Sequence, residues 1–105
     1  MGAWREGLGG IDGFYAGRPI QIKTLDSDRH RNVLDRANEA ERNAMNHGYR
    51  GVSLFLRAEN IERDRLVDFA RRGALILIPQ QGTIHSIDIL VKNGQWIHIE
   101  GGQIR

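Results

Sequence analysis

The sequence predicts an α/β domain with a mixed central sheet, and three observations lead to this fold class. Near each end of the chain, short alternating segments flank a glycine turn, as in a β-hairpin. Between these hairpins, two segments with apolar residues at helical spacing alternate with runs typical of buried strands. This strand–helix–strand–helix–strand order predicts parallel neighbouring strands joined by crossover helices. We therefore expect an N-terminal hairpin, two crossover helices and a C-terminal hairpin.

The N-terminal hairpin is predicted from residues 10–23, where a tight turn separates two short alternating segments. If Ala16-Gly17 is a two-residue loop, Tyr15 faces Arg18 and Gly13 faces Ile20. A four-residue loop gives the same register, whereas a three-residue loop does not. Residues 1–9 are predicted to form a helix end or a loop that leads into the hairpin.

The middle of the chain supplies the helices. Asp26-Ser27-Asp28 is typical of a helix N-cap, and Gly48 is typical of a helix end, so we place a helix at about residues 28–47. Mixed charges on its outer side indicate a solvated face. A second helix is expected from Glu59 or Asn60 to the Arg71-Arg72 pair. Strands are expected at 51–56, 74–78, 83–91 and 95–100. Pro79 ends the apolar strand at 74–78, and a loop follows at 80–82. Asn93-Gly94 forms a turn, and residues 101–105 form a short tail.

Length and composition limit the possible classes of protein. The 105 residues suffice for one domain with a modest core, so residues 1–105 are taken as a single unit. No apolar run reaches the length of a membrane span, and the N-terminus lacks the features of a signal peptide. The absence of cysteine excludes disulfides and thiolate chemistry. Met1-Gly2 is typical of an added start, which predicts a fragment of a larger protein. The net charge of +2, carried mostly by arginine, permits a polyanionic partner.

Three polar residues of the N-terminal hairpin form the sharpest chemical signal. In the predicted register Asp12 lies opposite Gln21, and Lys23 projects from the same side. A carboxylate and an amide oxygen are ligands for a hard cation such as Mg²⁺, and an adjacent ammonium suits chemistry on phosphate esters. Glu6 is a candidate for a further ligand. The alternative is an ordinary polar face in which Asp12 and Lys23 form a surface ion pair worth less than about 1 kcal/mol.

The order Gly10-Ile11-Asp12-Gly13, a turn with Gly17, and Ile20-Gln21-Ile22-Lys23 resembles the core of PD-(D/E)xK nucleases, in the branch with glutamine in place of the second acid. The resemblance implies a metal-dependent nuclease in which Asp12 and Gln21 bind Mg²⁺, or Mn²⁺ or Zn²⁺, and Lys23 assists catalysis. Glu6 would correspond to the acid of the preceding helix. The motif covers about a seventh of the chain, and the predicted order of elements extends the resemblance over most of it.

The small size also resembles C-terminal toxin domains of contact-dependent inhibition systems and other polymorphic bacterial toxins. This resemblance implies a secreted effector that acts in the cytoplasm of a target bacterium, with DNA or tRNA as substrate and a cognate immunity protein as partner. The basic residues expected nearest the hairpin are candidates for phosphate contacts. These residues are Arg18, Arg29, Arg31 and His30.

Two other classes of function stay open on the sequence alone. Gln21 in place of an acid, and the scarcity of acids before the hairpin, are consistent with a catalytically inactive module that binds nucleic acid or protein. A small interaction protein with no active site, such as an inhibitor, is the third possibility. Loss of cleavage in Lys23→Ala with folding retained distinguishes catalysis from binding, and metal titration distinguishes both from an inhibitor.

Overall fold

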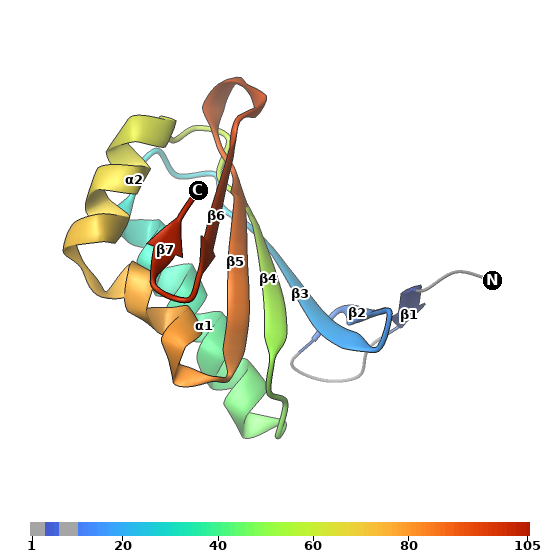
Figure 1. Ribbon diagram of the computed structural model, residues 1–105. Helices are drawn as coiled ribbons and strands as arrows, with labels where there is room; N and C mark the ends of the chain where they lie inside the picture. The colour runs from blue at the N-terminus through green and yellow to red at the C-terminus, as the bar shows by residue number, and fades with distance from the viewer. Residues whose placement is uncertain (1–3, 7–10) are drawn as a thin grey trace.

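The computed structural model describes residues 4–6 and 11–105, with side chains described from residue 11 onward. Helices and strands alternate along these residues, and Figure 1 shows two layers, with the helices on one side of a twisted sheet. The elements are β1 (Trp4–Glu6), β2 (Gly13–Tyr15), β3 (Arg18–Thr24), α1 (Arg31–Asn46), β4 (Val52–Arg57), α2 (Arg63–Arg72), the 3-10 helix η1 (Ala74–Gln81), β5 (Ile84–Leu90), the short 3-10 turn η2 (Lys92–Gly94), β6 (Trp96–Glu100) and β7 (Gln103–Ile104).

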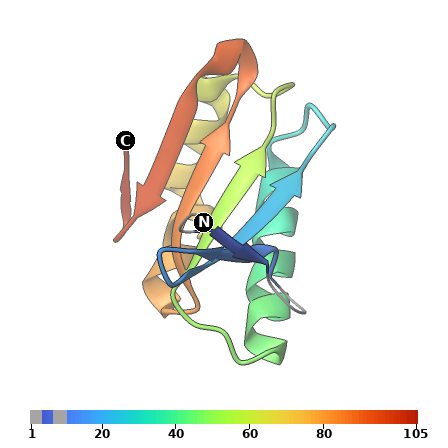
Figure 2. The same ribbon diagram turned by 90° about the vertical axis from the view of Figure 1, so that its right-hand side faces the viewer.

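The seven strands of the described chain form one mixed sheet in sequence order, from β1 to β7. The three central strands β3, β4 and β5 are parallel, and α1 and α2 are the crossovers between them. All other neighbouring strands pair antiparallel. Figure 2 shows the face of the sheet that the helices do not cover, with the helices behind the strands. The predicted mixed α/β fold, with hairpins at both ends and two crossover helices, is therefore confirmed.

The core lies between the sheet and the helices. Register brings Leu54 of β4 beside Ile87 of β5, and Ile87 beside Ile99 of β6, so a continuous apolar row faces the helices. These three side chains are fully buried. The core face of α1 carries Val33 and the small residues Ala37, Ala40 and Ala44, which lets the helix lie close to the sheet.

Both predicted hairpin turns are present. Tyr15 pairs with Arg18 and Gly13 with Ile20, which is the register expected from a two-residue loop. Ala16 and Gly17 have φ values of 51° and 81°, the left-handed conformation that such a loop requires. At the other end of the chain, Asn93-Gly94 also has positive φ at both residues and joins β5 to β6.

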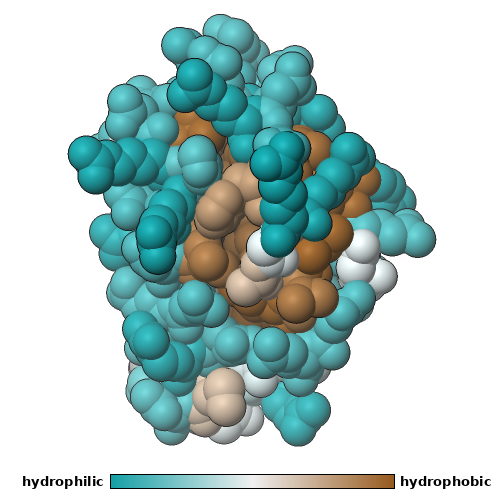
Figure 3. Space-filling model, turned by 90° about the vertical axis from the view of Figure 1, so that its left-hand side faces the viewer, coloured by the Kyte–Doolittle hydropathy of each residue, from teal (hydrophilic) through white to brown (hydrophobic). Residues whose placement is uncertain are grey.

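The predicted strand at 74–78 is wrong, because this segment forms η1. The place beside β4 is taken instead by β5, ten residues further along the chain. An apolar run of this length is compatible with a buried strand or a buried helix, and periodicity alone does not distinguish them. In η1 the buried residues Leu75 and Ile78 are three apart and lie on one side, whereas Leu77 is half exposed. Figure 3 shows this helical side, where apolar side chains gather inside a hydrophilic rim.

The helical conformation of η1 predicts unequal effects for two leucines two residues apart. We expect Leu75→Ala to lower the free energy of unfolding by about 2–5 kcal/mol, because it opens a cavity in the core. Leu77→Ala should cost about 1 kcal/mol, because its side chain is only partly buried. Urea denaturation of both variants measures the difference. Equal costs would contradict the helix, because a strand places both leucines on one face.

Three smaller expectations are also corrected. Trp4–Glu6 forms β1 and pairs with β2, so this part of the N-terminus is a strand. Helix α1 begins at Arg31, three residues later than predicted, because the Ser27 hydroxyl accepts hydrogen bonds from the Arg29 amide and the Asn32 side chain before the helix starts. Within the expected C-terminal tail, Gln103–Ile104 adds strand β7 to the sheet edge.

His98 lies on the open face of the sheet between two carboxylates. Its Nδ1 is 2.6 Å from Asp88 Oδ1, and its Nε2 is 2.9 Å from Glu100 Oε1. The hydrogen bond to Asp88 is the main cause that raises the pKa of His98 above 6.5, with a further contribution from Glu100, while burial acts in the opposite direction. The hydrogen bond to His98 lowers the pKa of Glu100 in turn. The cluster therefore joins β5 to β6 most strongly when the imidazole is protonated.

This cluster predicts a pH-dependent stability. Because folding raises the pKa of His98, its contribution is complete below the unfolded pKa and is lost as pH rises through the folded pKa. The free energy of unfolding of the wild type should therefore exceed that of His98→Gln by more at about pH 5.5 than at about pH 9. His85→Gln is a control. His85 Nε2 lies 3.5 Å from Glu100 Oε2, and among the described acids His85 contacts only Glu100, whereas His98 contacts two. An equal or larger difference at the higher pH would contradict the assignment.

Candidate metal and phosphodiester site

A hollow of about 220 Å³ lies where the N-terminal hairpin approaches α1. It brings together the three residues that the sequence singled out, and α1 contributes its other wall. Among the described residues, those that line it are Ile11, Asp12, Gln21, Ile22, Lys23 and Asn43.

Strand alternation explains why Gln21 and Lys23 face this hollow. Gln21 pairs with Leu54 of β4 and Lys23 with Leu56, so both lie on the helix-covered face of the sheet. Leu54 and Leu56 lie over the core, but β3 is nearer the sheet edge, where the helix layer ends. Polar side chains therefore replace the apolar ones at this edge.

The contacts that place Asp12 at the hollow differ from the simple strand pairing that the hairpin register predicted. It lies just outside β2, and its amide donates to the Ile20 carbonyl at 2.9 Å. Its carboxylate Oδ2 accepts the Ile22 amide at 2.6 Å, so a side chain replaces a backbone partner at the edge of β3. This contact fixes the carboxylate beside the backbone that links Gln21 to Lys23. The other carboxylate oxygen, Oδ1, accepts no hydrogen bond from the described residues and is available to a ligand.

Gln21 is almost completely buried, with 3% of its surface exposed, and its Oε1 has no hydrogen-bond partner among the described residues. A buried acceptor without a partner costs about 1–3 kcal/mol, so it points to a missing donor or cation. Glu41 Oε2 is a second atom of this kind, but Glu41 does not line the hollow. Gln21 therefore offers an oxygen at the position where the sequence predicts a metal ligand.

Lys23 is held at the hollow by α1. Its Nζ lies 3.5 Å from Glu39 Oε1, and Arg36 approaches the other oxygen of Glu39 at 3.4 Å. Sequence analysis missed both Glu39 and Asn43, and it placed Glu39 on a solvated face. The available signal was their spacing of four residues, which puts them on the same side of the helix.

The donors around the hollow fit a hard cation. Asp12 and Gln21 supply oxygen, and no imidazole of the described residues lines the hollow, so Mg²⁺ or Mn²⁺ suits it better than Zn²⁺. Within residues 11–105, no three acidic or histidine side chains gather as a metal site. A bound ion would therefore keep several of its waters. Glu6 lies in β1 opposite Gly13, one residue from Asp12, and its side chain lies outside the described part of the structure.

The predicted phosphate-binding residues are divided between two places. Arg18 lies at the exposed tip of the β2–β3 hairpin. Arg29, His30 and Arg31 lie at the start of α1, whereas Asn43 lies near its end, about 18 Å from Arg31 along the helix at about 1.5 Å per residue. His30 packs on Phe69 with 4.7 Å between ring centroids, and Arg65 borders the same surface. Because α1 runs antiparallel to β3, the three residues at the start of α1 lie at the opposite end of the helix from Asn43.

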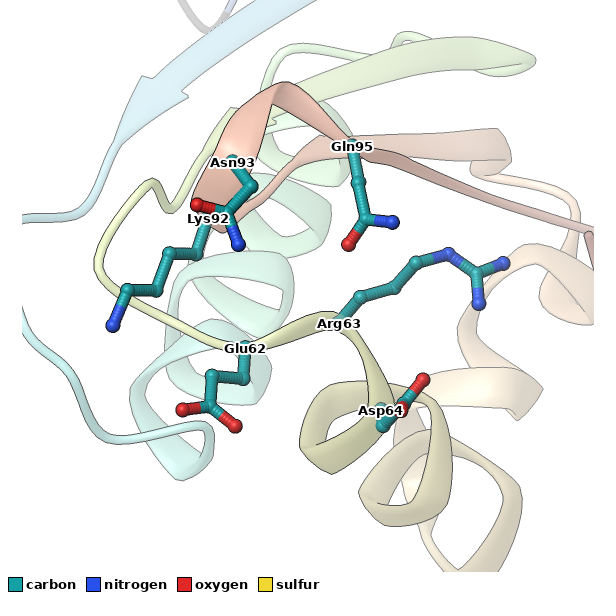
Figure 4. Close-up of a pocket in the computed structure, with 6 residues that line it drawn as sticks. All are labelled: Glu62, Arg63, Asp64, Lys92, Asn93 and Gln95. Atoms are coloured by element: carbon teal, nitrogen blue, oxygen red, sulfur yellow. The ribbon is translucent and has the colours of Figure 1, made fainter.

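A second opening of about 280 Å³ lies at the start of α2 (Figure 4). Two acids and two bases line it, so it has no excess charge to select an anion or a cation. In Figure 4 the Lys92 and Arg63 side chains extend in different directions, and Arg63 donates to the Trp96 carbonyl at 3.2 Å. None of the predicted site residues lines this opening. The lining residues are Glu62, Arg63, Asp64, Lys92, Asn93 and Gln95.

Comparison of the chain with family models, curated proteins and solved structures found no match. Neither α1 nor α2, the two longest helices of the described chain, has the length and apolar character that a membrane crossing requires.

Proposed function

We propose that this protein is a metal-dependent nuclease that hydrolyses phosphodiester bonds in DNA or RNA. The observation that carries the proposal is the hollow that Asp12, Gln21 and Lys23 share, together with the buried Oε1 of Gln21, which has no partner among the described residues. Two oxygen donors and one ammonium at this position agree with the Gln-x-Lys variant of the PD-(D/E)xK motif.

Asp12 and Gln21 would hold a Mg²⁺ or Mn²⁺ ion at the edge of β3. Such an ion neutralises charge that develops on the phosphate and makes a coordinated water more acidic. Asp12 supplies the negative charge for binding, and its hydrogen bond from Ile22 fixes the carboxylate orientation. Gln21 contributes a neutral oxygen, so the affinity for the ion should be lower than that of a site with two carboxylates.

Lys23 would act on the phosphate itself. In the hydrolysis, a water oxygen forms a bond to phosphorus while the bond from phosphorus to the leaving ester oxygen breaks. The attacking water loses a proton to solvent, and the leaving oxygen takes one from solvent. The Lys23 ammonium lies at the rim of the hollow, where it stabilises the negative charge that accumulates on the non-bridging oxygens.

The substrate class follows from charge and from the resemblance. Arg18 is exposed at the hairpin tip, and it would contact a phosphate there, as Arg29 and Arg31 would elsewhere along a polynucleotide. The similarity to polymorphic toxin domains extends the proposal to an antibacterial effector that cleaves DNA or tRNA in the cytoplasm of a target cell. A cognate immunity protein would then be its partner.

Incubation of the purified chain with plasmid DNA and with total tRNA tests the proposal. Each reaction contains Mg²⁺, Mn²⁺, Zn²⁺ or a chelator. We expect cleavage of at least one substrate with Mg²⁺ or Mn²⁺ and none with the chelator. Failure to cleave either substrate with any ion would contradict the proposal.

Two observations favour a second candidate, a catalytically inactive module that binds nucleic acid. Glu39 already neutralises Lys23, and Asp12 is the only described acid that lines the hollow. Such a module would retain polynucleotide in a binding assay without cutting it, and Lys23→Ala would change the affinity but no rate.

A further inference from the structure

The contact between Glu39 and Lys23 joins α1 to the candidate site. Residues 36, 39 and 43 lie on one side of α1, next to the buried row of alanines, and this side faces the edge of β3. Glu39 approaches Lys23 at 3.5 Å, and Asn43, one turn further on, lines the hollow. The wall opposite Asp12 and Gln21 is therefore built by this helix.

This ion pair contributes little to the stability of the fold. The Lys23 side chain is 21% exposed and that of Glu39 is 42% exposed, and partly solvated pairs are worth about 1 kcal/mol or less. Glu39 also contacts Arg36 within the helix, so its charge has a partner without Lys23. A purely structural role for the Glu39–Lys23 contact would therefore be weak.

The contact has a larger consequence for the position of the Lys23 ammonium. A lysine side chain has four rotatable bonds, and a free one distributes its charge over many conformations. One carboxylate on the helix favours those conformations in which Nζ lies beside Glu39, one turn from Asn43 of the hollow. Asp12 and Gln21 are fixed by a hydrogen bond and by burial, respectively, so Lys23 is the member of the site that needs an additional constraint.

We propose that Glu39 is a positioning residue that holds the Lys23 ammonium toward the bound phosphodiester group. Its role in cleavage rests on the proposed nuclease function, whereas its effect on the position of Lys23 does not. Glu39 acts through Lys23 and does not itself contact the substrate. The hairpin motif is then incomplete without a carboxylate from the crossover helix that follows it.

Kinetic measurements on Glu39 variants test the role in cleavage. We expect Glu39→Ala to lower kcat several-fold with a smaller change in KM, because a misplaced charge affects the transition state more than substrate binding. Glu39→Gln keeps an oxygen near the ammonium and should lose less. Combined with Lys23→Ala, Glu39→Ala should cause no further loss. Glu59→Ala is the matched control, because Glu59 forms an exposed pair with Arg57 away from the hollow.

A second measurement reports on Lys23 without any activity. The chain has only two lysines, Lys23 and Lys92, so limited acylation followed by peptide mass spectrometry compares them directly. We expect Glu39→Ala to raise the ratio of Lys23 to Lys92 acylation several-fold, and Glu59→Ala to leave it unchanged.

These outcomes separate the two proposals. An unchanged acylation ratio overturns the positioning role, as does a kcat for Glu39→Ala equal to that of Glu59→Ala. A raised ratio in a protein that cleaves no substrate would support the constraint on Lys23 and overturn the nuclease function alone.

Discussion

Lys23→Ala should lower nucleic-acid cleavage by about 10²- to 10³-fold, the usual cost of removing one group that stabilises transition-state charge. The variant should remain folded, because the side chain lies at the rim of the core and its ion pair contributes little to stability. Initial rates with the better of the two substrates, at saturating Mg²⁺, measure the loss.

Lys92→Ala is the matched control for this experiment. Lys92 lies in the turn between β5 and β6 and does not line the hollow, so its removal changes the net charge equally without changing the site. Equal rates for the two variants would show that Lys23 acts only through non-specific attraction of the polyanion.

Asp12→Asn should abolish most of the cleavage, by about 10²-fold or more, because it removes the only negative charge among the described side chains that line the hollow. Asparagine keeps the shape of the side chain and an oxygen that accepts the Ile22 amide, so the free energy of unfolding should change by less than about 1 kcal/mol. Cleavage assays and urea denaturation of the same preparation provide both values.

A higher concentration of Mn²⁺ should restore part of the activity of Asp12→Asn, because the remaining oxygen donors still bind the ion weakly. Asp26→Asn, at an exposed position after β3, controls for the change in net charge. A variant Asp12→Asn with wild-type rates would remove Asp12 from the site.

Local rules predicted most of the fold. The two turns were identifiable from Gly17 and from Asn93-Gly94, because glycine and asparagine adopt positive φ readily, whereas Ala16 adopts it against its usual preference. The helices followed from apolar spacing, and α1 shows this pattern in its buried alanines. The strand predicted at 74–78 was wrong because a segment in which every residue is apolar shows neither strand nor helix periodicity. Its conformation depends on the rest of the fold, in which β5 pairs with β4.

The sequence predicted the part of the candidate site that lies on the hairpin, but not the part that α1 contributes. The register brought Gln21 and Lys23 to one face, and the hollow confirms that Asp12 lies with them. The part built by α1 depends on how the helix crosses the sheet edge, which sequence spacing does not specify. For this reason Glu39 and Asn43 were missed.

The most direct test of the central claim is the position of a bound ion, measured by NMR during titration with Mn²⁺. Paramagnetic broadening should first affect the amide signals of Asp12, Gln21 and Ile22, and it should not affect those around Lys92. Asp12→Asn should lose this selective broadening at the same Mn²⁺ concentration. Broadening that begins elsewhere, for example at Glu62 and Asp64, or that is identical in wild type and Asp12→Asn, would contradict a metal site in the hollow.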